Sequence, residues 1–237
     1  MNQLLYLIIG ISWLAGFTAF LGSLIAYFER AGDSETKQEV IKGIVALGGG
    51  ILLAAVAFAL APRAIEILDI FTLTVTFCAG GLVFCIVDAL IANKSGNKAQ
   101  LMAMLLDFIP EAISMGAVFG QNRDMGFLLG GFIAAQNLPE GFNSFREMKE
   151  SGLKPSKILT GLFAVSFLGP LAAVTGYYFL QDQQVLTAGI MSFASGGILY
   201  LIFQDIAPQS TMKKHWIPPF GAVIGFAIGM IGHKLLS

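Results

Sequence analysis

Long apolar runs separated by short polar stretches make up nearly the whole chain. A transmembrane helix needs about 20 predominantly apolar residues to cross the hydrocarbon core of a bilayer. The polar stretches are too short to fold as soluble domains, so residues 1–237 are expected to form one transmembrane domain. The pattern predicts an all-α integral membrane protein. Eight runs meet the length requirement, at residues 4–28, 39–62, 70–93, 100–122, 125–147, 158–180, 185–207 and 215–236.

The composition agrees with a membrane location. Hydrophobic residues make up 56% of the chain and charged residues 12%, whereas about 25% of the residues in soluble domains are charged. A net charge of −1 gives no reason to expect a nucleic-acid partner. The first run is too long for the apolar region of a signal peptide and has no charged segment before it, so we expect it to remain as a membrane span.

The distribution of lysine and arginine predicts an orientation, because cytoplasmic loops carry an excess of these residues. If eight helices alternate in direction, eleven cations fall on one side and three on the other. This asymmetry places both termini outside the cytoplasm. The eleven are Arg30, Lys37, Lys42, Lys94, Lys98, Arg146, Lys149, Lys154, Lys157, Lys213 and Lys214, and the three are Arg63, Arg123 and Lys234.

A short internal repeat links the second and seventh runs. The second contains GGILLAAVAFALAP and the seventh contains GGILYLIFQDIAP, and these helices should cross the membrane in opposite directions. The fourth and fifth runs are also expected to be antiparallel. The order predicts a 3+2+3 arrangement with inverted repeats, in which transporters commonly place a substrate site at the bilayer midplane.

Two related polar motifs, DFIPEA and QNLPEG, interrupt the fourth and fifth runs. Asp107 and Glu111 are four residues apart in the first motif, and Gln136 and Glu140 are four apart in the second. Side chains at this spacing share one face of a helix. Each central helix is therefore predicted to present a pair of oxygen-bearing side chains near the middle of its span.

A proline directly precedes the glutamate in each motif, at Pro110 and Pro139. Proline lacks an N–H group, so the carbonyls of Leu106 and Ala135 lose their usual donors. An ionised carboxylate at the midplane costs about 3 kcal/mol on insertion scales. Protonation or a bound divalent cation would offset this cost, and cation binding displaces protons from its ligands. A structural kink is the alternative for one motif, but two matching copies favour a cation site.

The eight predicted helices and the Pro-Glu-Gly or Pro-Glu-Ala motif in both central helices resemble the ZIP (Zrt/Irt-like) divalent metal transporters. The resemblance covers essentially the whole chain. It implies a transporter rather than an enzyme, with a divalent metal ion as substrate moving toward the cytoplasm, no cofactor, and a homodimeric assembly in the bilayer. By this resemblance the midplane metal ligands are Asp107, Glu111, Gln136, Asn137 and Glu140.

The chain departs from the family pattern in the first motif, where Asp107 replaces histidine and Phe108 replaces asparagine. The run 158–180 lacks the glutamate found in some members, and Ser166 is the polar side chain nearest its middle. A single site with an all-oxygen shell is therefore expected. Oxygen ligands suit Mn²⁺ whereas imidazole suits Zn²⁺, so the expected ion is Zn, Mn or Fe, with weak discrimination in favour of zinc.

Further polar side chains are candidates for the cation path. Each also has an ordinary alternative, as a polar helix end or a packing group. An intramembrane hydrolase using paired carboxylates, and a non-transporting metal-sensing relative, remain alternatives for the function. Short loops without long insertions favour a bacterial inner membrane. The path candidates are Ser114, Asn143, Glu147, Ser166 and Asp205.

Overall fold

A computed structural model describes residues 2–29, 34–92, 99–213 and 215–236. Helices joined by turns and short irregular segments make up these residues, with one isolated β-bridge between Met212 and His215. Five helical stretches are long and apolar enough to cross a membrane, which confirms an all-α membrane protein. They are Gln3–Phe28, Glu35–Ile67, Ile70–Leu90, Pro155–Leu180 and Gln184–Gln209.

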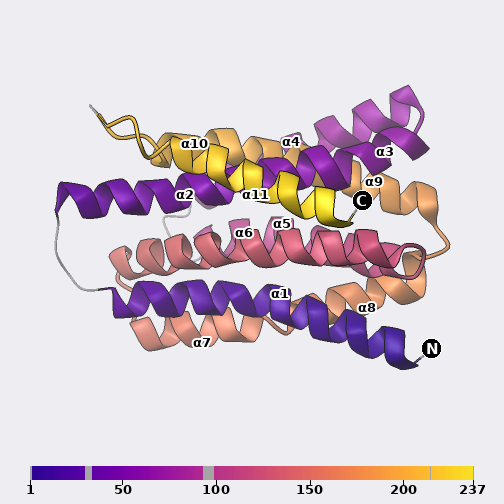
Figure 1. Cartoon of the computed structure of the whole chain (residues 1–237), viewed down its shortest axis with the longest axis horizontal. Coiled ribbons are helices and arrows are strands. Elements are labelled where there is room, and N and C mark those ends of the chain that lie inside the picture. Colours follow the sequence, from indigo (N-terminus) through magenta and orange to yellow (C-terminus); the bar gives the residue numbers. More distant parts are fainter. Residues whose placement is uncertain (1, 30–33, 93–98, 214, 237) are drawn as a thin grey trace.

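The helices lie in two layers (Figure 1). In one layer α1 packs along α6, and α5 packs along α8; in the other α11 packs along α2, and α4 along α9. Contacts of α2 with α6 and of α5 with α9 join the layers. The helical elements are α1 (Asn2–Phe28), α2 (Glu35–Ala55), η1 (Val56–Leu60), α3 (Ala61–Ile67), α4 (Ile70–Ala92), α5 (Ala99–Phe119), α6 (Arg123–Glu150), α7 (Pro155–Val165), α8 (Leu168–Leu180), α9 (Gln184–Leu201), η2 (Ile202–Ile206), α10 (Ala207–Gln209) and α11 (Phe220–Leu236).

Two predicted helices have different limits in the structure. The run 158–180 is divided at Ser166 into α7 and α8, because Pro170 has no N–H to donate to the carbonyl of Ser166. The run 215–236 becomes helical only at Phe220, after two consecutive prolines at 218 and 219. The first run is nevertheless one candidate span, Pro155–Leu180, as predicted, whereas the last helix starts five residues later than predicted.

The two runs that share the GGIL sequence also share a local distortion. Each contains a five-residue π-helical segment, η1 or η2, directly before an Ala-Pro pair. The N–H of Ala61 donates to the carbonyl of Val56, and that of Ala207 to the carbonyl of Ile202. The two helices run in opposite directions (Figure 1). A proline that cannot donate explains why an extra residue enters the turn before it.

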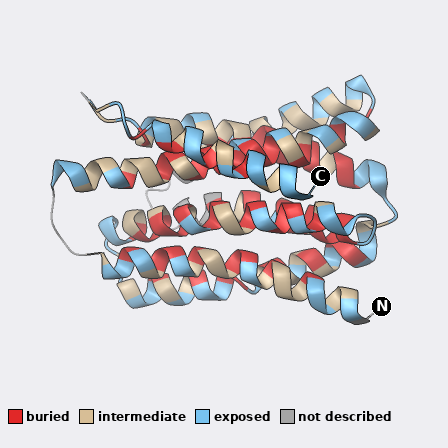
Figure 2. Ribbon diagram, viewed as in Figure 1, coloured by how far each residue is buried: buried red, intermediate tan, exposed pale blue. Residues whose placement is uncertain are grey.

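Three consecutive glycines allow α2 to lie against three neighbours. A Cβ atom added to Gly48 would lie 3.0 Å from Cγ of Pro139, and one added to Gly49 would lie 2.6 Å from Cγ2 of Ile206. At Gly50 an added Cβ would overlap the carbonyl oxygen of Ala222. These contacts bring α6, η2 and α11 to one stretch of α2. Buried residues gather along the middle of the layers, while helix ends and outward faces are exposed (Figure 2).

Candidate functional site

Helices α5 and α6 remain continuous through Pro110 and Pro139 and carry both polar motifs into the interior of the protein. Four of the five side chains predicted as metal ligands are at most 2% exposed. The fifth, Glu140, has both carboxylate oxygens buried. The structure therefore brings the two motifs into the same buried region.

Within this region the glutamates have different surroundings. Nε2 of Gln136 donates a hydrogen bond of 2.5 Å to Oε2 of Glu111. Both carboxylate oxygens of Glu140 lack a hydrogen-bond partner among the described residues, as does Oε1 of Gln136. Oδ1 of Asp107 accepts a 2.8 Å bond from the backbone N–H of Phe108. Buried polar atoms are nearly always hydrogen-bonded. The two oxygens of Glu140 are therefore the atoms of the site where a bound cation or proton would remove the largest unfavourable burial.

Asn137 faces a different neighbour. Its Nδ2 donates a 2.9 Å hydrogen bond to the carbonyl oxygen of Ala15 in α1. The close approach of these helices is possible because Gly141 lies against the backbone of Ala19, where a Cβ would overlap the carbonyl oxygen. The amide nitrogen of Asn137 thus fixes α6 to α1 in this conformation.

A cavity of about 60 Å³ adjoins the two motifs. This exceeds the ~10–15 Å³ that one water needs, so the space is large enough for a small cation. Backbone and apolar side chains of α2 form one wall, where Gly48 and Gly49 leave room. The polar side chains in its lining are Asp107, Glu140, Asn143, Ser144 and Asp205.

The carboxyls are not arranged as a finished metal site. Within the described residues, no three His, Cys, Asp or Glu side chains are placed so that they could hold one metal ion. Glu140 is nevertheless close enough to Asp107 and Glu111 for their charges to interact. The conformation therefore holds a buried acidic cluster in which one carboxyl is bound by an amide and another has no partner.

The predicted path residues divide into three kinds. Ser114 is fully buried and its hydroxyl has no partner in the described chain. The hydroxyl of Ser166 donates to the carbonyl of Phe163 at 2.6 Å, so it serves the break between α7 and α8. Asp205 lines the cavity, and Asn143 lines it and also donates 2.8 Å to Oε1 of Glu147.

Sequence reasoning missed two side chains near the site. Ser144 lines the cavity, is fully buried and has an unpartnered hydroxyl. Gln209 accepts a 3.0 Å hydrogen bond from Nδ2 of Asn143. Each follows a predicted site residue by four positions, Glu140 or Asp205, so the helical spacing could have identified both.

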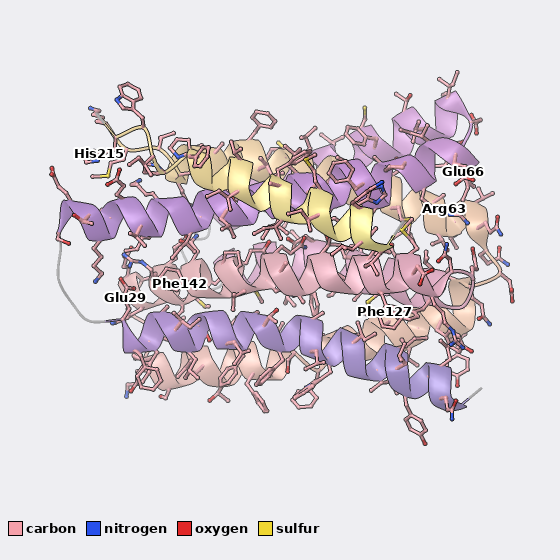
Figure 3. The ribbon with its side chains drawn as sticks, in the orientation of Figure 1. Glu29, Arg63, Glu66, Phe127, Phe142 and His215 are labelled. Carbon is pink, nitrogen blue, oxygen red and sulfur yellow. The ribbon has the colours of Figure 1, made fainter. Side chains whose placement is uncertain are left out.

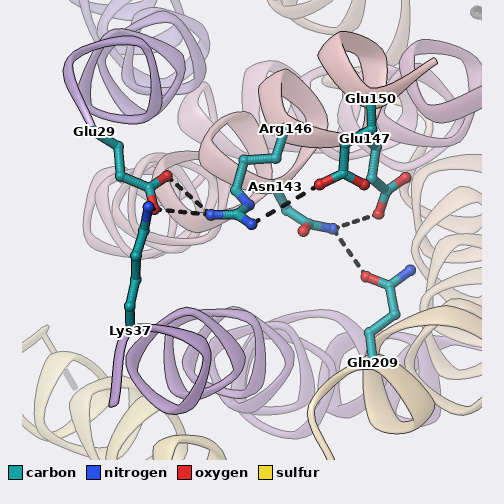
Figure 4. Close-up of polar contacts among 7 residues, drawn as sticks. All are labelled: Glu29, Lys37, Asn143, Arg146, Glu147, Glu150 and Gln209. Atoms are coloured by element: carbon teal, nitrogen blue, oxygen red, sulfur yellow. Dashed lines mark hydrogen bonds and ion pairs between the residues drawn. The ribbon is translucent and has the colours of Figure 1, made fainter. Parts of the chain in front are cut away.

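Charged side chains gather at the two ends of the bundle. Glu29, directly after α1, pairs with Lys37 at 3.0 Å and with Arg146 at 2.9 Å, whereas Arg63 pairs with Glu66 at the opposite end (Figures 3 and 4). Lys37 and Arg146 belong to the larger predicted group of cations and lie at one end, as expected. Four other members of that group lie outside the described residues, namely Arg30, Lys94, Lys98 and Lys214.

The side-chain atoms near the cavity that could bind a metal ion are all oxygen atoms. Both histidines lie elsewhere: His215 faces Glu39 at 3.5 Å, and the ring of His233 stacks on Phe58 with centroids 5.3 Å apart. The arrangement can bind a cation that accepts oxygen ligands, or protons. In comparisons with known proteins, no protein-family model matches the sequence and no curated protein matches it.

Proposed function

We propose that the chain is a divalent cation transporter of the ZIP type, which moves Zn²⁺, Mn²⁺ or Fe²⁺ as substrate toward the cytoplasm. The observation that carries the proposal is Glu140, whose two buried oxygens have no partner beside a cavity inside a membrane protein. A carboxylate in that position is costly unless a cation or proton offsets its charge. A transport site requires this kind of unsatisfied group.

Cation binding would change the partners within the cluster. The ligands proposed are Asp107, Glu111, Gln136 and Glu140. Oε1 of Gln136 is unpartnered and can face a cation, while its Nε2 holds Glu111 in the empty site. The ion would draw Glu140 and Asp107 inward and compete with the amide for Glu111. Asn137 would contribute through its oxygen or, with its nitrogen bound to Ala15, would only support α6.

The proposed topology has eight spans in a 3+2+3 arrangement with inverted repeats. Its support is the matched position of η1 and η2 in antiparallel helices, each followed by Ala-Pro. Both chain ends lie toward the same end of the bundle, as an even number of spans requires (Figure 1). The termini are proposed to face away from the cytoplasm in a bacterial inner membrane, and the assembly to be a homodimer.

The all-oxygen donor set decides which ions to test. Oxygen shells suit Mn²⁺, and Zn²⁺ also accepts carboxylates. We expect the purified protein to bind Mn²⁺ and Zn²⁺ with similar affinity. A competition assay that finds zinc bound far more tightly than manganese would refute this ion preference.

The function is tested by uptake of Zn²⁺, Mn²⁺ and Fe²⁺ into proteoliposomes. The wild-type protein is expected to take up the ions, and Glu111→Ala and Glu140→Ala are each expected to abolish this uptake. Glu66→Ala is the matched control, because Glu66 is exposed at the end of the bundle and pairs only with Arg63 in the contacts described. Unchanged uptake in both site variants would refute the assignment of Glu111 and Glu140 as ligands of the transported ion. Ion binding without uptake by the wild type would indicate a metal sensor instead.

A further inference from the structure

Asn143, in the cavity lining, makes polar contacts with Glu147 and Gln209 (Figure 4). Asn143 lines the cavity and uses its amide nitrogen twice, donating 2.8 Å to Oε1 of Glu147 and 3.0 Å to Oε1 of Gln209. An amide nitrogen has two hydrogens, so these two contacts engage both. Asn143 therefore stands between the cavity and the end where Glu29 lies.

Gln209 is held from two directions at the end of α10. Its side-chain oxygen accepts from Asn143 in α6, and its backbone carbonyl accepts 3.0 Å from Nζ of Lys42 in α2. That carbonyl lies at a helix end, where no intrahelical donor remains and a lysine is a suitable partner. The contact with Asn143 joins the two helix layers, because α6 and α10 belong to different layers.

We propose that Gln209 is the gating residue of the cation path, closing it at the Glu29 end of the bundle through its hydrogen bond to Asn143. The inference rests on the proposed function. A cation leaving the cavity would need Glu147 and the oxygen of Asn143 as its next ligands, but the two hydrogen bonds hold the nitrogen of Asn143 toward Glu147 and Gln209 until then. Opening exchanges a neutral amide contact for an ion–oxygen contact, and α10 separates from α6.

The position of Gln209 beyond η2 supports this role. Asp205 belongs to η2 and lines the cavity, and Gln209 follows it by one helical turn on the same face. π-Helical segments frequently occur at functional sites. Movement of this short helical end would therefore alter the contact with Asn143 and the position of Asp205 together.

The test measures access to the cavity, so it does not depend on transport. Ser144→Cys places a thiol in the cavity lining, in a background where the exposed Cys78 and Cys85 are replaced by serine. The protein is held in lipid nanodiscs and treated with a small charged thiol reagent. Gln209→Met keeps the length of the side chain but removes the oxygen that accepts from Asn143, and Gln209→Ala removes the reach of the side chain as well.

Both Gln209 variants are expected to raise the labelling rate of the cavity thiol about tenfold. Gln184→Met is the matched control, because Gln184 is exposed at the start of α9. In this variant the labelling rate of the cavity thiol should not change. Equal labelling rates in the wild type and both Gln209 variants would refute the proposal that Gln209 closes the path. Protection of the thiol by added Mn²⁺ or Zn²⁺ reports separately on the cation site, so faster labelling without protection would overturn the proposed function alone.

Discussion

The side-chain nitrogen of Gln136 lies 2.5 Å from Oε2 of Glu111 and donates a hydrogen bond to it. This bond joins α6 to α5 inside the protein, where the two residues are 0% and 1% exposed. The other polar atom of the amide, Oε1, has no partner in the described chain. The glutamate in the first motif is therefore hydrogen-bonded by the second motif, while Glu140 of the second motif has no hydrogen-bond partner among the described residues.

A double-mutant cycle should detect this bond in the stability of the protein. Gln136→Leu and Glu111→Leu each leave the other group buried without its partner, which costs about 1–3 kcal/mol. The double variant removes both groups, so its loss should be smaller than the sum of the single losses by about 1 kcal/mol. Thermal unfolding in detergent micelles measures the four proteins. Strict additivity would show that the two side chains do not interact.

Glu140→Gln should make the empty protein more stable and insensitive to cations. The amide is less costly to bury than a carboxylate without a partner. Wild type should gain about 2.7 kcal/mol when Mn²⁺ or Zn²⁺ is present at about 100 times its Kd, and the variant should gain almost nothing. Melting temperatures with and without the ion decide this. Glu66→Gln is the control, and an equal cation effect in Glu140→Gln would contradict the prediction.

Local sequence signals predicted most of the fold. The apolar length of α1 and α4 is a property of consecutive residues, so these spans could be read directly from the chain. The break at Ser166 and the late start at Phe220 also have local causes, in Pro170 and in Pro218 with Pro219. Apolar composition alone does not locate such interruptions, because they depend on where a proline removes a backbone donor.

The sequence predicts which residues belong to the candidate site, but not the contacts between them. Spacing of four residues predicted one polar face on each central helix. The structure brings Glu111 and Gln136 from these two faces into contact. The bond from Asn137 to Ala15 spans 122 positions, and its existence depends on how closely α6 approaches α1. Such distances follow from packing of the whole bundle. The same applies to the hydrogen bond between Asn143 and Gln209.

Asp69 supplies a pH-dependent contact outside the membrane spans. The Thr72 hydroxyl and the backbone N–H groups of Thr72 and Phe71 donate to its carboxylate and hold the pKa of Asp69 below its usual value. A lowered pKa means that this contact supports the start of α4 above pH ~3.9 and is lost as pH falls through the lowered pKa. Thr72→Val should raise the pKa of Asp69, measured by NMR titration of the carboxyl. An unchanged midpoint would exclude the hydroxyl as the cause.

Two glycines in α2 should respond in opposite ways to alanine. A Cβ at Gly50 would overlap the carbonyl oxygen of Ala222 and push α11 away from α2, so Gly50→Ala should destabilise the protein by about 1–3 kcal/mol. A Cβ at Gly43 would meet no atom within 4 Å, so Gly43→Ala should gain up to about 1 kcal/mol from helix propensity. Thermal unfolding in micelles compares the two substitutions. Equal effects of the two substitutions on stability would mean that α2 and α11 are not in direct backbone contact at Gly50.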